Sequence, residues 1–292
     1  MAPRRIVIQA HAKLNLGLRV VGRRPDGFHD VRTIYQSIAL TDRLTVVARP
    51  GPFALRCSDP ALPTDRRNLI HQAAARATRA AGRGALRGLS VDLDKQIPAE
   101  AGLGGGSADA AAMLRALARI WPGELDASTC RRVAARLGAD VPFFLLGGTA
   151  LGLGLGDELF PLVDLPRHWA VLLVPEFGVP TAGAYAWYDR APRRVRRAGA
   201  RRPLASRGGA LSSVVELTND LEPAVAAKHP EIRRMLAGLR RAGAAQPAMT
   251  GSGSCVFGLF PRRREAAKAA AMLRAGPWRV IVARTLARSE TV

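Results

Sequence analysis

The stretch 97–114, IPAEAGLGGGSADAAAML, places four glycines within five positions directly before an alanine-rich run. Glycine costs about 0.5–1 kcal/mol more than alanine to order in regular structure. The residues before it, LSVDLDKQI at 89–97, are typical of a strand, and residues 107–120 are typical of a helix. Free backbone N–H groups converge where a glycine turn enters a helix, and the helix dipole favours negative charge there. The stretch therefore predicts a loop that wraps a polyphosphate with its main chain.

Two familiar phosphate motifs do not fit this turn. The P-loop pattern needs a lysine after its last glycine, but Ser107 follows Gly106. The pattern GxGxxG, started at Gly102, places Ser107 at the position of the third glycine. Ser107 either caps the helix N-terminus or contacts a metal ion or phosphate. An ordinary tight connection is the alternative interpretation of the whole turn.

Composition limits the class of protein. The chain has 292 residues, 48% of them hydrophobic, which suits one large domain or two ordinary ones and excludes a disordered chain. The longest apolar runs, such as WAVLLVP at 169–175, are far shorter than a membrane span, and the N-terminus shows no signal-peptide pattern. We therefore expect a soluble, cytoplasmic protein. The scattered cysteines and histidines predict no disulfide scaffold and no zinc or histidine metal site.

The formal net charge of +21 raises the alternative of a nucleic-acid-binding protein. Only four of the 44 basic residues are lysine, and arginine and alanine are abundant along the whole chain. This pattern favours a general compositional bias over a binding groove. The densest cluster, 190–207, is rich in Pro, Gly and Ala and is either a solvated loop or a polyanion contact. We expect no nucleic-acid partner, although positive potential would steer small anions inward.

Strand and helix patterns alternate along the chain, which predicts an α+β or α/β architecture. The expected strands are 5–21, 41–47, 89–97, a glycine-laced hairpin at 148–159, 169–175, a strand after the turn at 249–254, and 278–285. The expected helices are 68–82, 107–120, 127–137, 181–189, 230–242 and 264–274. A change of pattern near residue 160 suggests two lobes, 1–160 and 161–292.

Several motifs occur in an order that resembles the GHMP small-molecule kinases. They are AKLNLGLRVVGRRPDGFHD (12–30), NLI (68–70), DKQIPAEAGLGGGSADAA (94–111), LGADVPFF (137–144) and MTGSGSCVFGLF (249–260). The resemblance implies an N-terminal mixed α/β nucleotide-binding lobe and a C-terminal ferredoxin-like lobe. It also implies ATP and Mg²⁺ as cofactors, a small-molecule alcohol as substrate, and a monomer or homodimer.

Within that family, RRPDGFHD and LGADVPFF resemble the branch that phosphorylates a cytidine diphosphate ester of methylerythritol. Homoserine- and mevalonate-type kinases share the glycine turns and are the alternative. The resemblance does not identify Mg²⁺ ligands.

The resemblance implies a catalytic pair, Asp140 and Lys13. A positioned carboxylate can accept the proton of an attacking hydroxyl, and an ammonium can keep that carboxylate ionised. The alternatives are that Asp140 only caps a turn before Pro142 and that Lys13 is a surface lysine on an edge strand. Asn15, two residues from Lys13, would share its strand face and could orient substrate hydroxyls.

The resemblance also implies the nucleotide site. Asn68 and Lys95 match positions that flank the base and phosphates of ATP. The loop itself comprises Pro98, Ala99, Glu100, Ala101, Gly102, Leu103, Gly104, Gly105, Gly106, Ser107 and Ala108. Family members often carry glycine at position 101 and serine at 108, so a hydroxyl contact from position 108 is absent here.

At the cytidine end, His29 matches a residue that hydrogen-bonds the cytosine edge. Phe28 stands where the family usually has tyrosine, and Tyr185 matches an aromatic on the opposite side of the base. Ordinary core packing is the alternative for both rings, and a loop histidine is the alternative for His29. Thr181, Gly251 and Gly253 match positions that line the substrate cleft. Cys255 is expected to be an apolar strand residue, and TND at 218–220 resembles the start of a helix.

Overall fold

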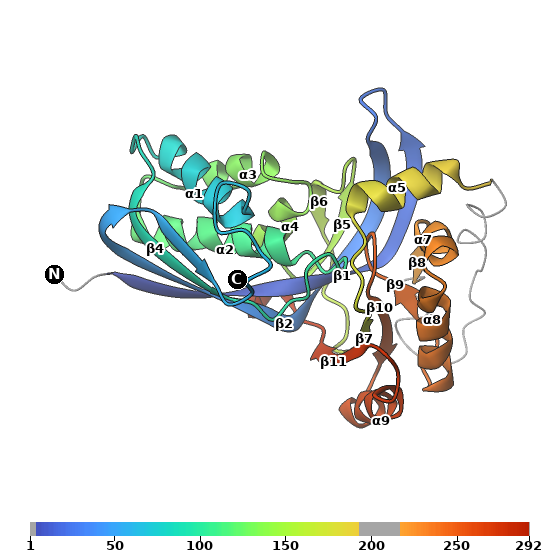
Figure 1. The fold of residues 1–292 in the computed structure, drawn as a ribbon. Coiled ribbons are helices and arrows are strands. Elements are labelled where there is room, and N and C mark those ends of the chain that lie inside the picture. Colours follow the sequence, from blue (N-terminus) through green and yellow to red (C-terminus); the bar gives the residue numbers. More distant parts are fainter. Residues whose placement is uncertain (1–3, 193–216, 292) are drawn as a thin grey trace.

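The computed structural model describes residues 4–192 and 217–291, so positions 193–207 of the arginine-rich stretch lie outside the described residues. Figure 1 shows two sheets with helices packed against them. The larger sheet has the strand order β3-β4-β2-β1-β8, with β5 pairing with β2 and β6. Its strands are β1 (Arg5–Arg23), β2 (His29–Pro52), β3 (Ala54–Cys57), β4 (Arg87–Asp94), β5 (Thr149–Leu153), β6 (Glu158–Pro161) and β8 (Thr218–Asn219).

Strands β1 and β2 form a long antiparallel hairpin that extends beyond the body of the sheet (Figure 1). Two register shifts, between His11 and Ala12 and between Asn15 and Gly17, interrupt the ladder in the middle of β1. Such bulges bend a strand and re-aim its side chains. The strand expected at 41–47 is thus one part of a strand more than twice as long.

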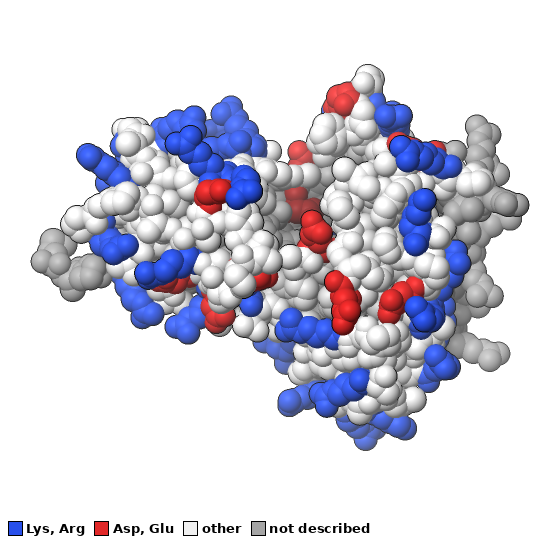
Figure 2. Space-filling model, in the orientation of Figure 1, with Lys and Arg blue, Asp and Glu red and all other residues white. Residues whose placement is uncertain are grey.

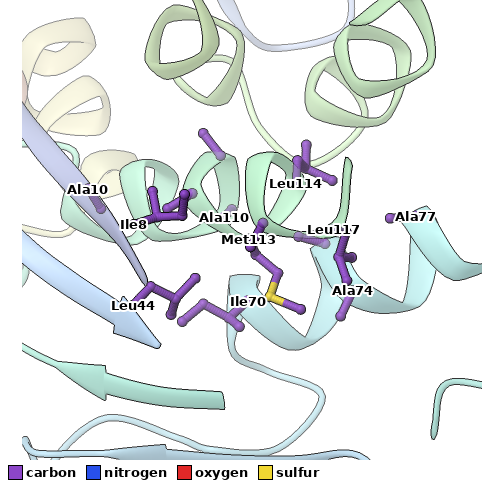
Figure 3. Packing of buried hydrophobic residues seen from close by; sticks show 14 of the residues in the cluster. Ile8, Ala10, Leu44, Ile70, Ala74, Ala77, Ala110, Met113, Leu114 and Leu117 are labelled. Atoms are coloured by element: carbon purple, nitrogen blue, oxygen red, sulfur yellow. The ribbon is translucent and has the colours of Figure 1, made fainter. Parts of the chain in front are cut away.

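Four helices cover one face of this sheet: α1 (Leu69–Ala80), α2 (Gly105–Ile120), α3 (Ala127–Ala135) and α4 (Val141–Leu146). Helix α2 is central, and most of its residues are buried. Figure 3 shows Met113 of α2 beside residues of α1 and of strand β2, whereas Leu114 points to the opposite side of α2. Ala74 of α1 and Ala110 of α2 are fully buried in the same cluster, and their small side chains let the two helices lie close together.

The smaller sheet contains β7 (Trp169–Val174), β9 (Ala248–Met249), β10 (Val256–Phe260) and β11 (Arg279–Arg284). Its order is β11-β7-β10-β9, and every pair is antiparallel. Helices precede β9 and β11, so the connectivity is the split β-α-β of a ferredoxin-like lobe. The associated helices are α5 (Thr181–Arg190), α7 (Glu222–Lys228), α8 (Glu231–Arg241) and α9 (Arg263–Leu273), and a short 3-10 turn, η1 (Arg288–Glu290), follows β11.

Strand β7 is apolar throughout because both of its faces are buried. Val171 and Leu173 pack in the cluster with α8 and α9, whereas Ala170 and Leu172 pack against residues of the large sheet. The predicted α+β fold with a mixed N-terminal lobe and a ferredoxin-like C-terminal lobe is confirmed. Residues 218–219 form the two-residue strand β8, and the next helix begins only at Glu222, so TND does not start a helix. No helix in the described part of the chain is long and apolar enough to span a membrane.

Candidate active site

Four polar side chains lie on one face of the β1–β2 hairpin and form a connected network. Lys13 and Asn15 alternate along β1, and Thr33 and Tyr35 alternate along β2, where Asn15 pairs with Tyr35. Lys13 Nζ donates to Asn15 Oδ1 at 2.5 Å, and Asn15 Nδ2 donates to Thr33 Oγ1 at 2.7 Å. All four residues are buried, so Asn15 holds the ammonium of Lys13 in a fixed place.

Asp140 enters this network from the loop before α4. Its Oδ2 lies 3.7 Å from Lys13 Nζ, and its Oδ1 accepts a hydrogen bond of 2.9 Å from the Tyr35 hydroxyl. The Asp140 side chain is 34% exposed, so the carboxylate is open to a ligand. Asp140 occupies the N-cap position of α4, but its side chain makes no capping hydrogen bond there, so the carboxylate is engaged by Lys13 and Tyr35 and not by the helix.

Lys13 is not a surface residue on an edge strand. It is 3% exposed, and β1 lies between β2 and β8. Burial lowers the pKa of Lys13 from its usual range, and the neighbouring Asp140 carboxylate opposes that shift. The pair therefore joins a buried ammonium to an accessible carboxylate.

The glycine turn leads into α2 through Gly104, which has a left-handed φ of 74° and is the N-cap residue. Ser107 therefore lies within the first helical turn, and the expectation that it caps the helix is wrong. Gly104 takes the cap position because the chain needs a positive φ there, which serine adopts at a cost. The Ser107 hydroxyl, partly exposed, makes no hydrogen bond within the described residues.

Packing within the protein accounts for three of the four glycines. A Cβ atom on Gly102 would lie 2.1 Å from the Thr250 carbonyl oxygen, one on Gly104 would lie 2.6 Å from the Phe144 ring, and one on Gly105 would lie 2.8 Å from Lys95 Nζ. A Cβ on Gly106 would meet only Leu69, at 3.6 Å. Gly106 is exposed, so it is the position where the main chain is most open to a ligand.

The remaining loop residues divide into two groups. The side chains of Ala101, Leu103 and Ala108 are buried, so only their backbone could face a nucleotide. Ala99 and Glu100 are exposed and Pro98 is half-buried. Among the loop side chains, Ser107 is the accessible hydrogen-bond donor, whereas the exposed Glu100 carboxylate would repel phosphate. The phosphate contacts predicted from the sequence thus reduce to backbone groups and the Ser107 hydroxyl.

The second glycine turn, 250–254, packs directly against the first. A Cβ on Gly251 would lie 3.0 Å from the Gly102 carbonyl oxygen and 3.1 Å from Lys13 Nζ. Asn219 holds this turn, since its Nδ2 donates to the carbonyls of Met249 at 2.8 Å and Gly251 at 2.7 Å. The fixed backbone of the C-terminal lobe therefore forms one wall around the ammonium of Lys13.

Lys95 and Asn68 have structural partners beside the loop. Lys95 Nζ donates to Asp42 and, at 2.8 Å, to Asp109, and its side chain is 6% exposed. Asn68 is the N-cap of α1, with its Oδ1 accepting from Ile70 N at 2.9 Å. The polar atoms of both side chains are thus engaged by partners within the protein. Contact of either residue with ATP stays a prediction.

The group formed by Lys95, Asp42 and Asp109 has one cation for two buried carboxylates. Burial, reinforced by the neighbouring Asp42, raises the pKa of Asp109 to about 7 despite the opposing charge of Lys95. Asp109 Oδ1 is buried and has no hydrogen-bond partner. This cluster lies directly below Gly105 and anchors the start of α2.

The cytidine-end residues gather where α5 crosses the β1–β2 hairpin (Figure 1). His29 is buried, its Nε2 lies 2.8 Å from Asp189 Oδ1, and its ring stacks on Tyr185 at a centroid distance of 4.8 Å. Phe28 is 63% exposed, which excludes core packing for that ring. Burial, followed by the charge of Asp140, raises the pKa of Tyr185 to about 12.

Thr181, the first residue of α5, contacts the second glycine turn: its Oγ1 lies 3.2 Å from Ser252 Oγ, within hydrogen-bond distance. Cys255, the expected apolar strand residue, is fully buried just before β10. Burial raises the pKa of its thiol far above the usual range, so the thiol is inert.

Sequence analysis missed several residues around the site: Thr33, Tyr35, Asp42, Asp109, Asp189 and Thr250. No alternation marks Thr33 and Tyr35, because their strand also carries the polar residues Arg32, Gln36 and Ser37. Asp189 lies 160 positions from His29, and no local pattern links them.

Figure 2 shows acidic side chains along the hollow between the two halves of the molecule. Lys and Arg side chains are scattered over the outer surface of both halves. On this face the basic residues form no continuous stripe of the kind that tracks a nucleic-acid backbone. The described residues also contain no group of three or more His, Cys, Asp or Glu side chains that could hold a metal ion.

Comparisons with known proteins agree with this geometry. The chain matches the model for the GHMP kinases N terminal domain over residues 68–148 and that for the GHMP kinases C terminal over 200–277. It is 40% identical over 285 residues to the 4-diphosphocytidyl-2-C-methyl-D-erythritol kinase of Moorella thermoacetica, covering 96% of this chain and 99% of the relative.

Two solved structures are similar. A crystal structure of 4-(cytidine 5'-diphospho)-2C-methyl-D-erythritol kinase superposes with a TM-score of 0.77 at 36% identity, covering 96% of this chain and 99% of that one. Homoserine kinase from Cytophaga hutchinsonii has a TM-score of 0.72 over 97% of this chain and 95% of its own, but at 18% identity it shows the fold alone. The chain therefore belongs to the 4-diphosphocytidyl-2-C-methyl-D-erythritol kinase family of the GHMP kinases.

Proposed function

We propose that the protein transfers the γ-phosphoryl group of ATP to the 2-hydroxyl of 4-diphosphocytidyl-2-C-methyl-D-erythritol, a step of non-mevalonate isoprenoid precursor biosynthesis. The products are the 2-phosphate and ADP. The observation that carries this proposal is the accessible Asp140 carboxylate, 3.7 Å from the buried Lys13 ammonium, beside two interlocked glycine turns. The names of relatives at about 40% identity support the choice of substrate.

In this proposal Asp140 accepts the proton of the attacking hydroxyl. Phosphoryl transfer needs mainly positioning and charge stabilisation, and a general base adds about 10²–10⁴ in rate. Lys13 keeps Asp140 ionised and stabilises negative charge that develops on the acceptor oxygen. The Asn15 amide is engaged by Lys13 and Thr33, which supports a role in holding Lys13 in addition to any contact with substrate hydroxyls.

The proposed triphosphate site is the main chain of 98–108 at the start of α2. The first N–H groups of a helix have no intrahelical partners, and the dipole of α2 favours negative charge there. Gly106 is the point of closest approach, because nothing but Leu69 lies near its missing side chain.

Mg²⁺ would reach this site with the nucleotide. It needs only one or two protein oxygens in addition to phosphate oxygens and water, so the absence of a three-residue metal group among the described residues is compatible with it. The Ser107 hydroxyl, which has no partner in the described structure, fits that role. The ion would neutralise charge on the β- and γ-phosphates.

The cytidine diphosphate moiety would extend from the catalytic pair toward α5. Phe28 presents an exposed ring for stacking on the base, and His29 and Tyr185 form the adjoining surface. Thr181, Gly251 and Gly253 would line the path of the diphosphate. A lobe boundary near residue 160, a cytoplasmic location and a monomeric or dimeric state remain predictions from the sequence.

The test is ATP consumption by the purified protein with 4-diphosphocytidyl-2-C-methyl-D-erythritol, homoserine and mevalonate as separate acceptors. We expect turnover with the cytidylyl substrate alone, and ³¹P NMR should show a phosphomonoester on its 2-hydroxyl. Faster turnover with homoserine or mevalonate would contradict the proposal and favour another GHMP kinase activity.

A further inference from the structure

Two glycines of the β5–β6 hairpin enclose the ring of Tyr35. A Cβ atom on Gly152 would lie 2.7 Å from Tyr35 Cε2, and one on Gly156 would lie 2.4 Å from the Tyr35 hydroxyl oxygen. The ring also stacks on Phe143 of α4 at a centroid distance of 4.8 Å. Tyr35 is 2% exposed, so these neighbours restrict the position of its ring and hydroxyl.

The enclosed hydroxyl determines how Asp140 is presented. It donates to Asp140 Oδ1 at 2.9 Å, whereas the other oxygen, Oδ2, has among the described residues one charged neighbour, Lys13 Nζ at 3.7 Å. That separation is too long for a hydrogen bond. Oδ2 is therefore the oxygen that remains available for a ligand.

The phenol keeps its proton under working conditions. Burial, followed by the charge of Asp140, raises the pKa of Tyr35 well above its usual range. Charged or ionisable groups around this point come from four elements: Lys13 from β1, Asp140 before α4, Tyr185 from α5 and Asp157 from the β5–β6 turn. The Tyr35 hydroxyl is thus a permanent donor to Oδ1.

We propose that the β5–β6 hairpin is a positioning device for the base: Gly152 and Gly156 seat Tyr35, and Tyr35 fixes Asp140 so that Oδ2 faces the substrate hydroxyl. This inference rests on the proposed role of Asp140 as the base. The proton of the hydroxyl passes to Oδ2 while the acceptor oxygen bonds to the γ-phosphorus and the bond to ADP breaks. Tyr35 and the glycines are positioning residues, since neither touches the reacting atoms.

The test compares kcat and KM for Y35F, G156A, the double variant Y35F/G156A, and G154A. Y35F keeps the shape of the ring and removes the donor, so kcat should fall about 10- to 100-fold while KM for ATP changes little. G156A should lower kcat to a similar extent by displacing the hydroxyl. Gly154 is the control from the same turn: both glycines have a positive φ, +63° at Gly154 and +99° at Gly156, but the nearest atoms to a Cβ on Gly154 are the side-chain ends of Glu158 and Asp157. G154A should retain the kcat of the wild type.

The double variant gives the sharpest comparison. Without the hydroxyl, the nearest ring atom to a Cβ on Gly156 is Cζ at 3.6 Å, an ordinary contact. G156A should therefore cost nothing further in kcat in the Y35F background. Thermal melting of each variant verifies that it is folded.

Two results would overturn the inference. Y35F with the kcat of the wild type would show that the hydroxyl does not position the base. An equal loss from G156A with and without the tyrosine hydroxyl would show that Gly156 acts through the turn conformation alone. Both results leave the proposed function intact, whereas wild-type protein without activity on the cytidylyl substrate would contradict the proposed function itself.

Discussion

Gly102 and Thr250 are in backbone contact, so close that a methyl group on Gly102 would lie 2.1 Å from the Thr250 carbonyl oxygen. The neighbouring backbone bonds, Cys255 N to Ala101 O at 3.2 Å and Lys13 N to Leu103 O at 3.0 Å, join the nucleotide loop to both β1 and the C-terminal lobe. The glycine-rich loop is thus part of the packed interior as well as a candidate ligand surface. Its glycines should respond differently to substitution.

Gly102→Ala should destabilise the protein, and Gly106→Ala should not. Gly102 combines a φ of +73° with a clash against backbone atoms, and strain and overpacking each cost about 1–3 kcal/mol. Gly106 has space for a methyl group, so Gly106→Ala should leave stability unchanged or raise it slightly, while KM for ATP rises. Urea unfolding and ATP kinetics measure the two effects. Equal stability losses in both variants would contradict this assignment.

Phe28→Ala should weaken binding of the cytidylyl substrate without unfolding the protein. The ring is 63% exposed, so its removal leaves the core intact. Stacking of an aromatic on a base is worth about 1–3 kcal/mol, which predicts a KM increase of about 5- to 100-fold with kcat and melting temperature nearly unchanged. Val21→Ala, at a site 70% exposed on the same hairpin, is the control. An unchanged KM in Phe28→Ala would remove Phe28 from the substrate site.

Asp109 should make the protein less stable as the pH rises from about 4 to about 7. Burial raises the pKa of Asp109 from 3.8 to about 7, so the folded state binds more protons than the unfolded state in this window. Stability therefore falls with rising pH, by on the order of 1–4 kcal/mol. Asp109→Asn removes this titration and leaves Lys95 paired with Asp42.

Urea unfolding of wild type and Asp109→Asn at pH 4 to 8 measures the difference. The stability of the wild type relative to the variant should decline across this window. Asp92→Asn, at a site with a 44% exposed side chain, should follow the wild type. A constant difference between wild type and Asp109→Asn would show that Asp109 is ionised throughout.

Periodic elements could be predicted from the sequence, and polar site strands could not. Helices α1, α2, α8 and α9 begin and end within two residues of their expected limits. Helices α1, α8 and α9 each have one buried apolar face, whereas α2 is a long alanine-rich run that is buried over most of its surface. The first part of β2, 29–40, does not show a clean alternation, because Thr33, Gln36 and Ser37 are buried polar residues. Their partners come from distant parts of the chain: Gln36, for example, donates to the Leu286 carbonyl at 2.8 Å.

In the candidate site, too, some residues could be predicted from sequence motifs and others depend on tertiary contacts. The motifs identify Lys13 and Asp140 through resemblance, and the structure brings them to 3.7 Å. Local rules offered the helix cap as one of two roles for Ser107, but Gly104, with its left-handed backbone, takes that position. The glycine-laced hairpin was expected as an element, yet its contact with Tyr35 requires tertiary structure, since residues 35 and 156 are far apart in the chain.

The most direct test of the account is single-turnover phosphoryl transfer by Asp140→Asn, with enzyme in excess over ATP and the cytidylyl substrate at saturating concentration. Asparagine keeps the shape of the side chain and cannot accept the proton, so the rate should fall by about 10²–10⁴ while the protein stays folded and retains ATP. A rate equal to that of the wild type would contradict the assignment of Asp140 as the base.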